Sequence, residues 1–333
     1  MGRRSRPEAA SANDRASASD DGRATPGGPT RAPRIAFVLS GGGNQGAAQV
    51  GMLRALIEAG IRPDVVIGCS AGALNGAAVA YAPNLTGVAR LANVWCELTG
   101  NEVFPGSKLS RAWNVVRRGT HLFTNDGLQQ IIRTATPARS FADLSVPLRV
   151  IAADLDSGEE VVFSRGPLEP ALLASAALPG VFPVVPHDGR RLVDGGIIDA
   201  VPLWHAFCGP VDIVYVLNVS HGSSAREFRS PLDVVMASFA HSRNLRYEIE
   251  KRFLPAGVQI IELPRPDDAR DLFDFSGGEA IIDAAYELTR DHLAALASAS
   301  RRGDGAEPTP AAEAHQRIKF RIPPRRRAAM ARR

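Results

Sequence analysis

Val65-Val66-Ile67-Gly68-Cys69-Ser70-Ala71-Gly72 is the stretch of sequence that sets the fold of this chain. The apolar run predicts a buried strand, and the small residues after it predict a tight turn into a helix over residues 73–80. Glycines two positions before and after Ser70 suit this turn, because it brings backbone segments too close for side chains. The Ser70 hydroxyl would lie at a helix N-terminus, where backbone N–H groups favour developing negative charge. The pattern predicts that Ser70 is a nucleophile, although Gly-x-Ser-x-Gly is short enough to occur by chance.

A second glycine-rich turn comes earlier in the chain. Residues 34–39 predict a buried strand, residues 47–57 have the apolar spacing of a helix, and Ser40-Gly41-Gly42-Gly43-Asn44-Gln45-Gly46 joins them. Consecutive glycines between a strand and a helix leave backbone N–H groups uncovered and able to approach an anion. That anion is either the pyrophosphate of a dinucleotide or the oxyanion of a tetrahedral acyl intermediate.

The spacing of Gly41, Gly43 and Gly46 matches the dinucleotide fingerprint, so a nucleotide-binding oxidoreductase is one alternative. The fingerprint needs an acidic residue at the end of the next strand to bind a ribose hydroxyl. That position carries Gly68 and Ser70, and the nearby acid, Asp64, precedes the strand. The sequence therefore favours an oxyanion loop.

A third block is Leu192-Val193-Asp194-Gly195-Gly196. An isolated Asp-Gly pair is usually a turn. Here it follows the segment 174–183 (Ala-Ser-Ala-Ala-Leu-Pro-Gly-Val-Phe-Pro) and a hairpin-like segment over 186–190. Asp194 is therefore a candidate for a functional carboxylate.

Taken in order, these blocks resemble the patatin-like phospholipase family, over roughly residues 34–297. The resemblance implies a three-layer α/β/α fold with a central, largely parallel sheet. It implies Ser70 as nucleophile, Asp194 as general base, and no metal or organic cofactor. The glycines of the blocks would either supply oxyanion amides (Gly41, Gly42, Gly43) or support the turns (Gly46, Gly68, Gly72, Gly195, Gly196).

The activity that the resemblance implies is hydrolysis of carboxylic esters of lipids through an acyl-enzyme on Ser70. A Ser-Asp-His triad is the alternative, since His205, His221 and His241 all follow Asp194. The family usually has Arg or Lys where this chain has Gln45. This departure keeps a further alternative open, a lipid- or protein-binding module that has weak hydrolysis or none.

Both ends of the chain are polar and lack apolar runs, so we expect disordered tails over 1–33 and 299–333 around one domain, 34–298. The formal net charge is +4, yet residues 301–333 hold ten Lys or Arg and three acids. That tail contributes +7 and the remainder about −3 (4 minus 7). Little aromatic sequence interleaves with the basic residues, so no nucleic-acid partner is expected.

Three cysteines form no disulfide framework, and no apolar leader is visible, so we expect a cytoplasmic protein. Peripheral contact with the anionic inner face of a membrane is left open. Trp113 with Arg117 and Arg118 could form a lid that meets an anionic lipid surface. Residues 232–253 have helical apolar spacing, and we expect Leu245 and Ile249 on its core-facing side. The oligomeric state is left open.

Overall fold

The computed structural model describes residues 31–103, 120–220, 231–267 and 274–303. Two compact units divide the chain, Met1–Ala32 and Pro33–Arg333, and the fold belongs to the second. The expected lid with Trp113, Arg117 and Arg118 lies outside the described residues, as do His221 and nearly all of both tails.

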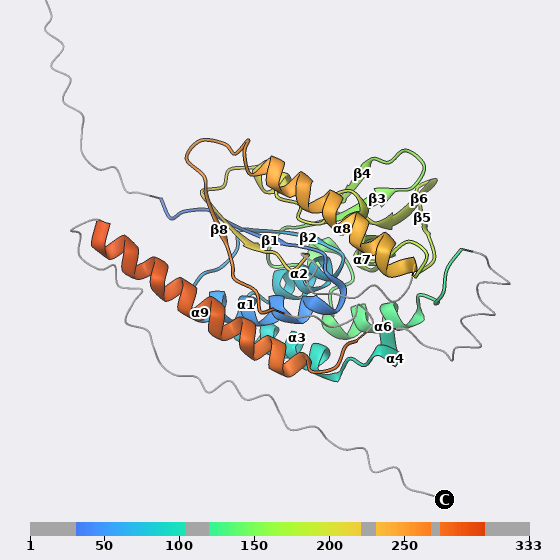
Figure 1. The fold of residues 1–333 in the computed structure, drawn as a ribbon, viewed down its shortest axis with the longest axis horizontal. Coiled ribbons are helices and arrows are strands. Elements are labelled where there is room, and N and C mark those ends of the chain that lie inside the picture. Colours follow the sequence, from blue (N-terminus) through green and yellow to red (C-terminus); the bar gives the residue numbers. More distant parts are fainter. Residues whose placement is uncertain (1–30, 104–119, 221–230, 268–273, 304–333) are drawn as a thin grey trace, which may run out of the picture. The chain divides into compact units, whose positions relative to one another are not determined.

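One sheet of eight strands forms the middle of this unit (Figure 1). Its strands are β1 (Ile35–Leu39), β2 (Val65–Cys69), β3 (Leu148–Asp154), β4 (Glu160–Phe163), β5 (Val185–His187), β6 (Arg190–Asp194), β7 (Ile213–Leu217) and β8 (Gln259–Glu262). Their order is β5-β6-β3-β2-β1-β7-β8, with β4 also paired to β3. The neighbouring strands β3, β2, β1, β7 and β8 are parallel to one another. The strands β4 and β6 pair antiparallel with β3, and β5 pairs antiparallel with β6. The expected largely parallel sheet is confirmed, with an antiparallel end.

Helices cover both faces of the sheet, which gives the expected three layers (Figure 1). Those with eight or more residues are α1 (Gly46–Glu58), α2 (Ala71–Tyr81), α3 (Leu85–Glu97), α6 (Asp126–Ala135), α7 (Leu168–Ser175), α8 (Pro231–Glu250) and α9 (Gly278–Gly303). The short ones are α4 (Gly100–Val103), η1 (Gly43–Gln45), η2 (Phe141–Asp143), η3 (Gly195–Ile197) and η4 (Trp204–Phe207).

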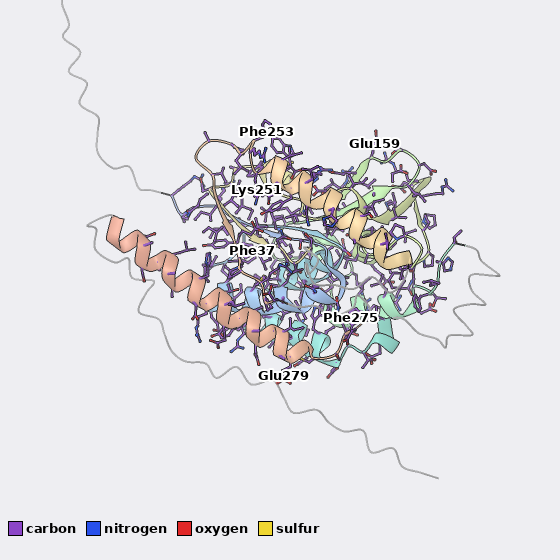
Figure 2. All side chains as sticks on the ribbon, in the orientation of Figure 1. Phe37, Glu159, Lys251, Phe253, Phe275 and Glu279 are labelled. Atoms are coloured by element: carbon purple, nitrogen blue, oxygen red, sulfur yellow. The ribbon has the colours of Figure 1, made fainter. Side chains whose placement is uncertain are left out.

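Alternation along the strands divides the core in two. Phe37 and Leu39 of β1 pack with α1, α2, α3 and α9, while Ala36 and Val38 face the layer that contains α8 and η4. Phe37 is fully buried, whereas Phe253, just beyond α8, is 69% exposed at the rim (Figure 2). Because both faces of β1 are buried, its sequence is apolar throughout rather than alternating.

The packing of α8 differs from the expectation. Leu245 and Ile249 are exposed, and the buried residue of this turn is Tyr247, which belongs to the same buried core cluster as Val38 and Leu203. The expectation for Leu245 and Ile249 is therefore wrong, because helical spacing alone does not say which of two apolar stripes meets the sheet. At the other end of the chain, α9 runs on to Gly303, past residue 298.

Strand register brings the three sequence blocks to one place. Leu39 pairs with Gly68 of β2, so the glycine-rich loop and Ser70 leave the sheet side by side. Cys69 pairs with Ile151 of β3, and the next β3 residue, Ala152, pairs with Asp194 of β6. Ser70 and Asp194 thus reach β3 from its two sides at nearly the same level. No helix in the described ranges is both long and apolar enough to cross a membrane.

Candidate active site

Ser70 lies at the apex of the turn between β2 and α2, in a backbone conformation with φ 54° and ψ −125°. This is a strained region for a residue with a side chain. The glycines around it are required by contact: a Cβ on Gly68 would lie 2.5 Å from the Gly72 carbonyl oxygen, and one on Gly72 would lie 2.3 Å from the Leu39 carbonyl oxygen. The chain therefore holds Ser70 in a sharp elbow that only glycine neighbours allow.

A second serine, Ser175, holds the backbone of the elbow in place. The Ser70 N–H donates to Ser175 Oγ at 2.9 Å, and the Ser175 hydroxyl donates to the Ile151 carbonyl oxygen at 2.6 Å. Ser175 is fully buried at the end of α7. Ser175 lies within the segment 174–183, whose local pattern does not indicate what the hydroxyl contacts, so the sequence predicts no role for it.

Ser70 and Asp194 meet directly. The Ser70 hydroxyl donates to Asp194 Oδ2 at 2.6 Å, and the Gly196 N–H donates to Asp194 Oδ1 at 2.7 Å. Asp194 is buried, and the thiol of Cys69 lies 3.8 Å from Oδ1. A Cβ on Gly195 would lie 2.5 Å from the Ile151 carbonyl oxygen, so the turn after Asp194 also packs too tightly for a side chain. A serine hydroxyl bonded to a held carboxylate is an arrangement that can transfer a proton.

The glycine-rich loop lies over this pair. A Cβ on Gly41 would lie 3.3 Å from Ser70 Cβ, and a Cβ on Gly42 would lie 2.8 Å from Val219 Cγ2. The Gly41 N–H donates to the Ala200 carbonyl oxygen at 2.8 Å, so it is already committed and cannot also face an oxyanion in this conformation. Gly43 takes a left-handed φ of 57° at the start of η1. The assignment of oxyanion amides to this loop stays a prediction, with Gly42 and Gly43 as its remaining candidates in this conformation.

The alternative cofactor anchor lies at the wrong end of the sheet. Asp64 precedes β2, and its carboxylate accepts the N–H of Ile35, the first residue of β1. The glycine-rich loop follows the last residue of β1. Asp64 is therefore a strand-length away from the loop, where it cannot bind the ribose of a dinucleotide whose pyrophosphate sits there.

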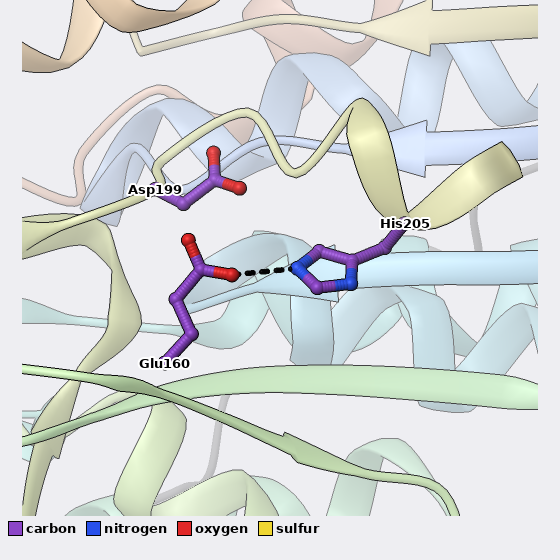
Figure 3. A group of neighbouring side chains, drawn as sticks. All are labelled: Glu160, Asp199 and His205. Carbon is purple, nitrogen blue, oxygen red and sulfur yellow. Dashed lines mark hydrogen bonds and ion pairs between the residues drawn. The ribbon is translucent and has the colours of Figure 1, made fainter. Parts of the chain in front are cut away.

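A charged cluster forms around Asp199, five residues after Asp194, and Figure 3 shows three of its members, Glu160, Asp199 and His205. His205 Nε2 and Glu160 Oε2 are 2.8 Å apart, and the Arg246 guanidinium forms ion pairs with Glu160, Asp199 and Glu250. Burial raises the pKa of Asp199 to about 7, against the opposing effect of Arg246. The hydrogen bond from His205 lowers the pKa of Glu160.

Three of these groups have the chemistry of metal ligands. The ligand atoms of Glu160, Asp199 and His205 lie within 4.8 Å of one another. Arg246 pairs with both carboxylates, so the protein's own guanidinium takes the place that a cation would need. We therefore assign no metal to this cluster.

The cluster also bears on the triad alternative. His205 is bonded to Glu160, and both oxygens of Asp194 are engaged by Ser70 and Gly196. His241 is exposed on α8, and His221 lies outside the described residues. His205 therefore pairs with Glu160 and not with the carboxylate that accepts from Ser70.

Comparison with known proteins identifies the class. A family model described as patatin-like phospholipase matches residues 37–207, just over half of the chain. The chain therefore belongs to the patatin-like phospholipase family.

Individual relatives agree with this assignment. An uncharacterized NTE family protein of Mycobacterium tuberculosis is 33% identical over 173 residues, which are 51% of this chain and 45% of that protein. Neuropathy target esterase of Drosophila melanogaster is 30% identical over 306 residues, 81% of this chain and 20% of the esterase. The chain thus spans less than half the length of these relatives.

Among solved structures, human GIVD cytosolic phospholipase A2 matches 81% of this chain and 59% of its own, at 13% identity and a TM-score of 0.48. VipD from Legionella pneumophila matches 79% of this chain and 67% of its own, at 14% identity and a TM-score of 0.43.

Proposed function

We propose that this protein is a serine lipid acyl hydrolase that cleaves carboxylic esters of lipids, phospholipids among them, through an acyl-enzyme on Ser70. The observation that carries the proposal is the 2.6 Å hydrogen bond from the Ser70 hydroxyl to Asp194, made at a strained elbow in a member of the patatin-like phospholipase family. Residues 34–298 would form the catalytic domain.

In the acylation half-reaction, Ser70 Oγ attacks the ester carbonyl carbon while its proton passes to Asp194 Oδ2. The carbonyl oxygen becomes an oxyanion, which the N–H groups of Gly42 and Gly43 would stabilise together with the N-terminus of α2. The intermediate then collapses, the bond to the alcohol breaks, and the protonated Asp194 returns its proton to the leaving alcohol. The products of this half are an acyl-Ser70 and a free alcohol or lysolipid.

Deacylation uses the same groups in reverse. A water molecule takes the place of the alcohol and gives a proton to Asp194 as its oxygen attacks the acyl carbon. The ester bond to Ser70 breaks, the proton returns to Ser70 Oγ, and a fatty acid leaves. The Gly196 N–H bond to Oδ1 keeps the other carboxylate oxygen facing Ser70 throughout.

The substrate class is tested with a panel of esters, from short p-nitrophenyl esters to long-chain phospholipids. Ser70→Ala and Asp194→Asn should each lose activity on every ester that the wild type cleaves, and a fluorophosphonate should label the wild type but not Ser70→Ala. Ser157→Ala is the matched control, because Ser157 is an exposed serine far from the elbow in sequence. His205→Asn should keep kcat, since His205 bonds Glu160 and not the pair.

Loss of activity in His205→Asn, at unchanged folding, would favour a triad over the pair. A folded wild type that cleaves none of the esters and takes no fluorophosphonate label would overturn the proposal. The remaining alternative would then be a module that binds a lipid or a protein without hydrolysis.

A further inference from the structure

Three buried polar side chains from three helices form a chain of hydrogen bonds beneath the glycine-rich loop. The Trp95 indole N–H of α3 donates to Asn75 Oδ1 of α2 at 2.8 Å, and Asn75 Nδ2 donates to Gln49 Oε1 of α1 at 2.9 Å. Gln49 and Asn75 are fully buried, and Trp95 nearly so. We call Gln49, Asn75 and Trp95 the amide relay.

The amide relay ends on both flanks of the loop. Gln49 Nε2 donates to the Ser40 carbonyl oxygen at 2.8 Å, directly before Gly41. Asn75 Nδ2 donates to the Gly46 carbonyl oxygen at 2.9 Å, directly after Gln45. Residues 41–45 are therefore a short arch whose two ends are held by adjacent members of one network.

The Trp95 N–H sets the direction of the whole relay. An indole nitrogen can only donate, so the Asn75 atom facing it must be the carbonyl oxygen. The Asn75 amide nitrogen must then face Gly46 and Gln49, which in turn forces the Gln49 nitrogen toward Ser40. Gln49 also donates to the Leu217 carbonyl oxygen at 3.0 Å, where β7 ends.

Contact explains why the loop depends on the relay. A Cβ on Gly46 would lie 2.6 Å from the Trp95 ring, so the residue that closes the arch rests on the same tryptophan that orients the amides. The Ser40 hydroxyl accepts the Val219 N–H at 2.7 Å, which ties the other end of the arch to the segment that follows β7. The amides of Gly42 and Gly43 lie between these two fixed ends, Ser40 and Gly46.

We propose that Gln49, Asn75 and Trp95 are positioning residues that hold both ends of the loop 41–45, so that the Gly42 and Gly43 amides face the oxyanion formed at Ser70. This rests on the proposed hydrolase function and names residues that touch no reacting atom. A relay that served stability alone would set the melting temperature and leave the oxyanion amides where they are.

The test separates these two roles. Asn75→Ala removes both donor bonds of Asn75 and should lower kcat by about tenfold to a hundredfold on the best ester of the panel, with KM within about twofold, because ground-state binding does not use the oxyanion amides. A trifluoromethyl ketone, which binds as an oxyanion on Ser70, should lose affinity by about the same factor as kcat/KM. Leu56→Ala, a buried position on α1 away from the loop, should lower the melting temperature without changing kcat.

Trp95→Phe is the milder variant, in case Asn75→Ala does not fold. It removes the indole N–H together with the outer part of the ring that contacts Gly46, and it leaves the two donor bonds of Asn75 in place. We therefore expect kcat to fall by less than in Asn75→Ala but in the same direction, together with ketone affinity. Folded Asn75→Ala or Trp95→Phe enzyme with wild-type kcat and ketone affinity would overturn the proposal. A wild type without esterase activity or labelling would instead overturn the hydrolase function.

Discussion

Two buried polar groups flank the candidate active site, on opposite faces of the sheet, and they are built from different chemistry. The amide relay on the α1 face is neutral, and each of its amides has a donor or acceptor opposite it. The cluster on the α8 face, made of Glu160, Asp199, His205, Arg246 and Glu250, is ionic. There, Asp199 Oδ2 and Glu160 Oε1 are buried and face the Arg246 guanidinium as ion pairs, without an aligned hydrogen bond.

Both groups hold the same loop. The relay holds Ser40 and Gly46, while the ionic cluster holds Asp199, whose neighbour Ala200 accepts the Gly41 N–H. A neutral network keeps its geometry at any pH, whereas an ionic one changes with the protonation of its members. We therefore expect the stability contributed by the amide relay to be independent of pH, and the stability contributed by the ionic cluster to change with pH.

The largest expected effect is on the ionic side. Arg246→Met removes the cation that Glu160 and Asp199 share, and should cost about 2–3 kcal/mol of unfolding free energy at pH 8. This is less than for a fully buried pair, because 34% of the Arg246 side chain is exposed. Urea unfolding measures it, with Arg290→Met on the exposed face of α9 as a control that should change stability by less than about 0.5 kcal/mol.

The pH dependence comes next. The pKa of Asp199 is raised from 3.8 to about 7 in the folded protein, so the folded state binds more protons than the unfolded chain between these values. The contribution of this group to stability is therefore present below about pH 4 and is lost as the pH rises through about 7. Asp199→Asn cannot ionise, so its stability relative to wild type should increase between pH 5 and pH 8. A difference that stays constant over that range would contradict the raised pKa.

On the neutral side we expect a smaller change that does not depend on pH. Trp95→Phe leaves Asn75 Oδ1 buried without its donor, and should cost about 1–2 kcal/mol of unfolding free energy. The cost should be equal at pH 5 and pH 8, since no member of the relay titrates in that range. A difference from wild type that changes between pH 5 and pH 8, as expected for Asp199→Asn, would show that the two sides are not distinct.

The smallest effect is the coupling between the two sides. The relay and the ionic cluster share no side chain and lie on opposite faces of the sheet. The double variant Arg246→Met, Trp95→Phe should therefore lose the sum of the two single losses of unfolding free energy, within about 0.5 kcal/mol. A larger interaction energy would mean that the glycine-rich loop couples the relay to the ionic cluster, so that a change in one alters the stability contributed by the other.

The sequence predicted the parts of this fold that depend on local pattern. The strands Ile35–Leu39 and Val65–Cys69 form where the apolar runs predict them, and the elbow at Ser70 follows from the glycines around it. Family resemblance paired Ser70 with Asp194, but their contact depends on β6 lying antiparallel beside β3. Local sequence does not record which strands become neighbours.

The features that the sequence did not predict depend on tertiary contacts. Ser175 has its role because its hydroxyl bridges the Ser70 N–H and the Ile151 carbonyl oxygen of β3, and the Gly41 N–H is already bonded because Ala200 lies opposite it. On α8, the spacing of Leu245 and Ile249 suggested a core-facing stripe, yet Tyr247 takes that place. In each case the deciding contact joins segments that are far apart in the chain.

The turn between β5 and β6 sets the register of β6, and with it the position of Asp194. Asp188 and Gly189 both have positive φ, and they join β5 to β6 as a two-residue hairpin that places His187 opposite Arg190. A slip of one residue in β6 against β3 would turn the Asp194 side chain to the other face of the sheet and leave Ser70 without its partner. Such a molecule would keep most of its secondary structure. The fraction of purified protein that takes one equivalent of fluorophosphonate is then a quality control for strand register, which circular dichroism cannot provide.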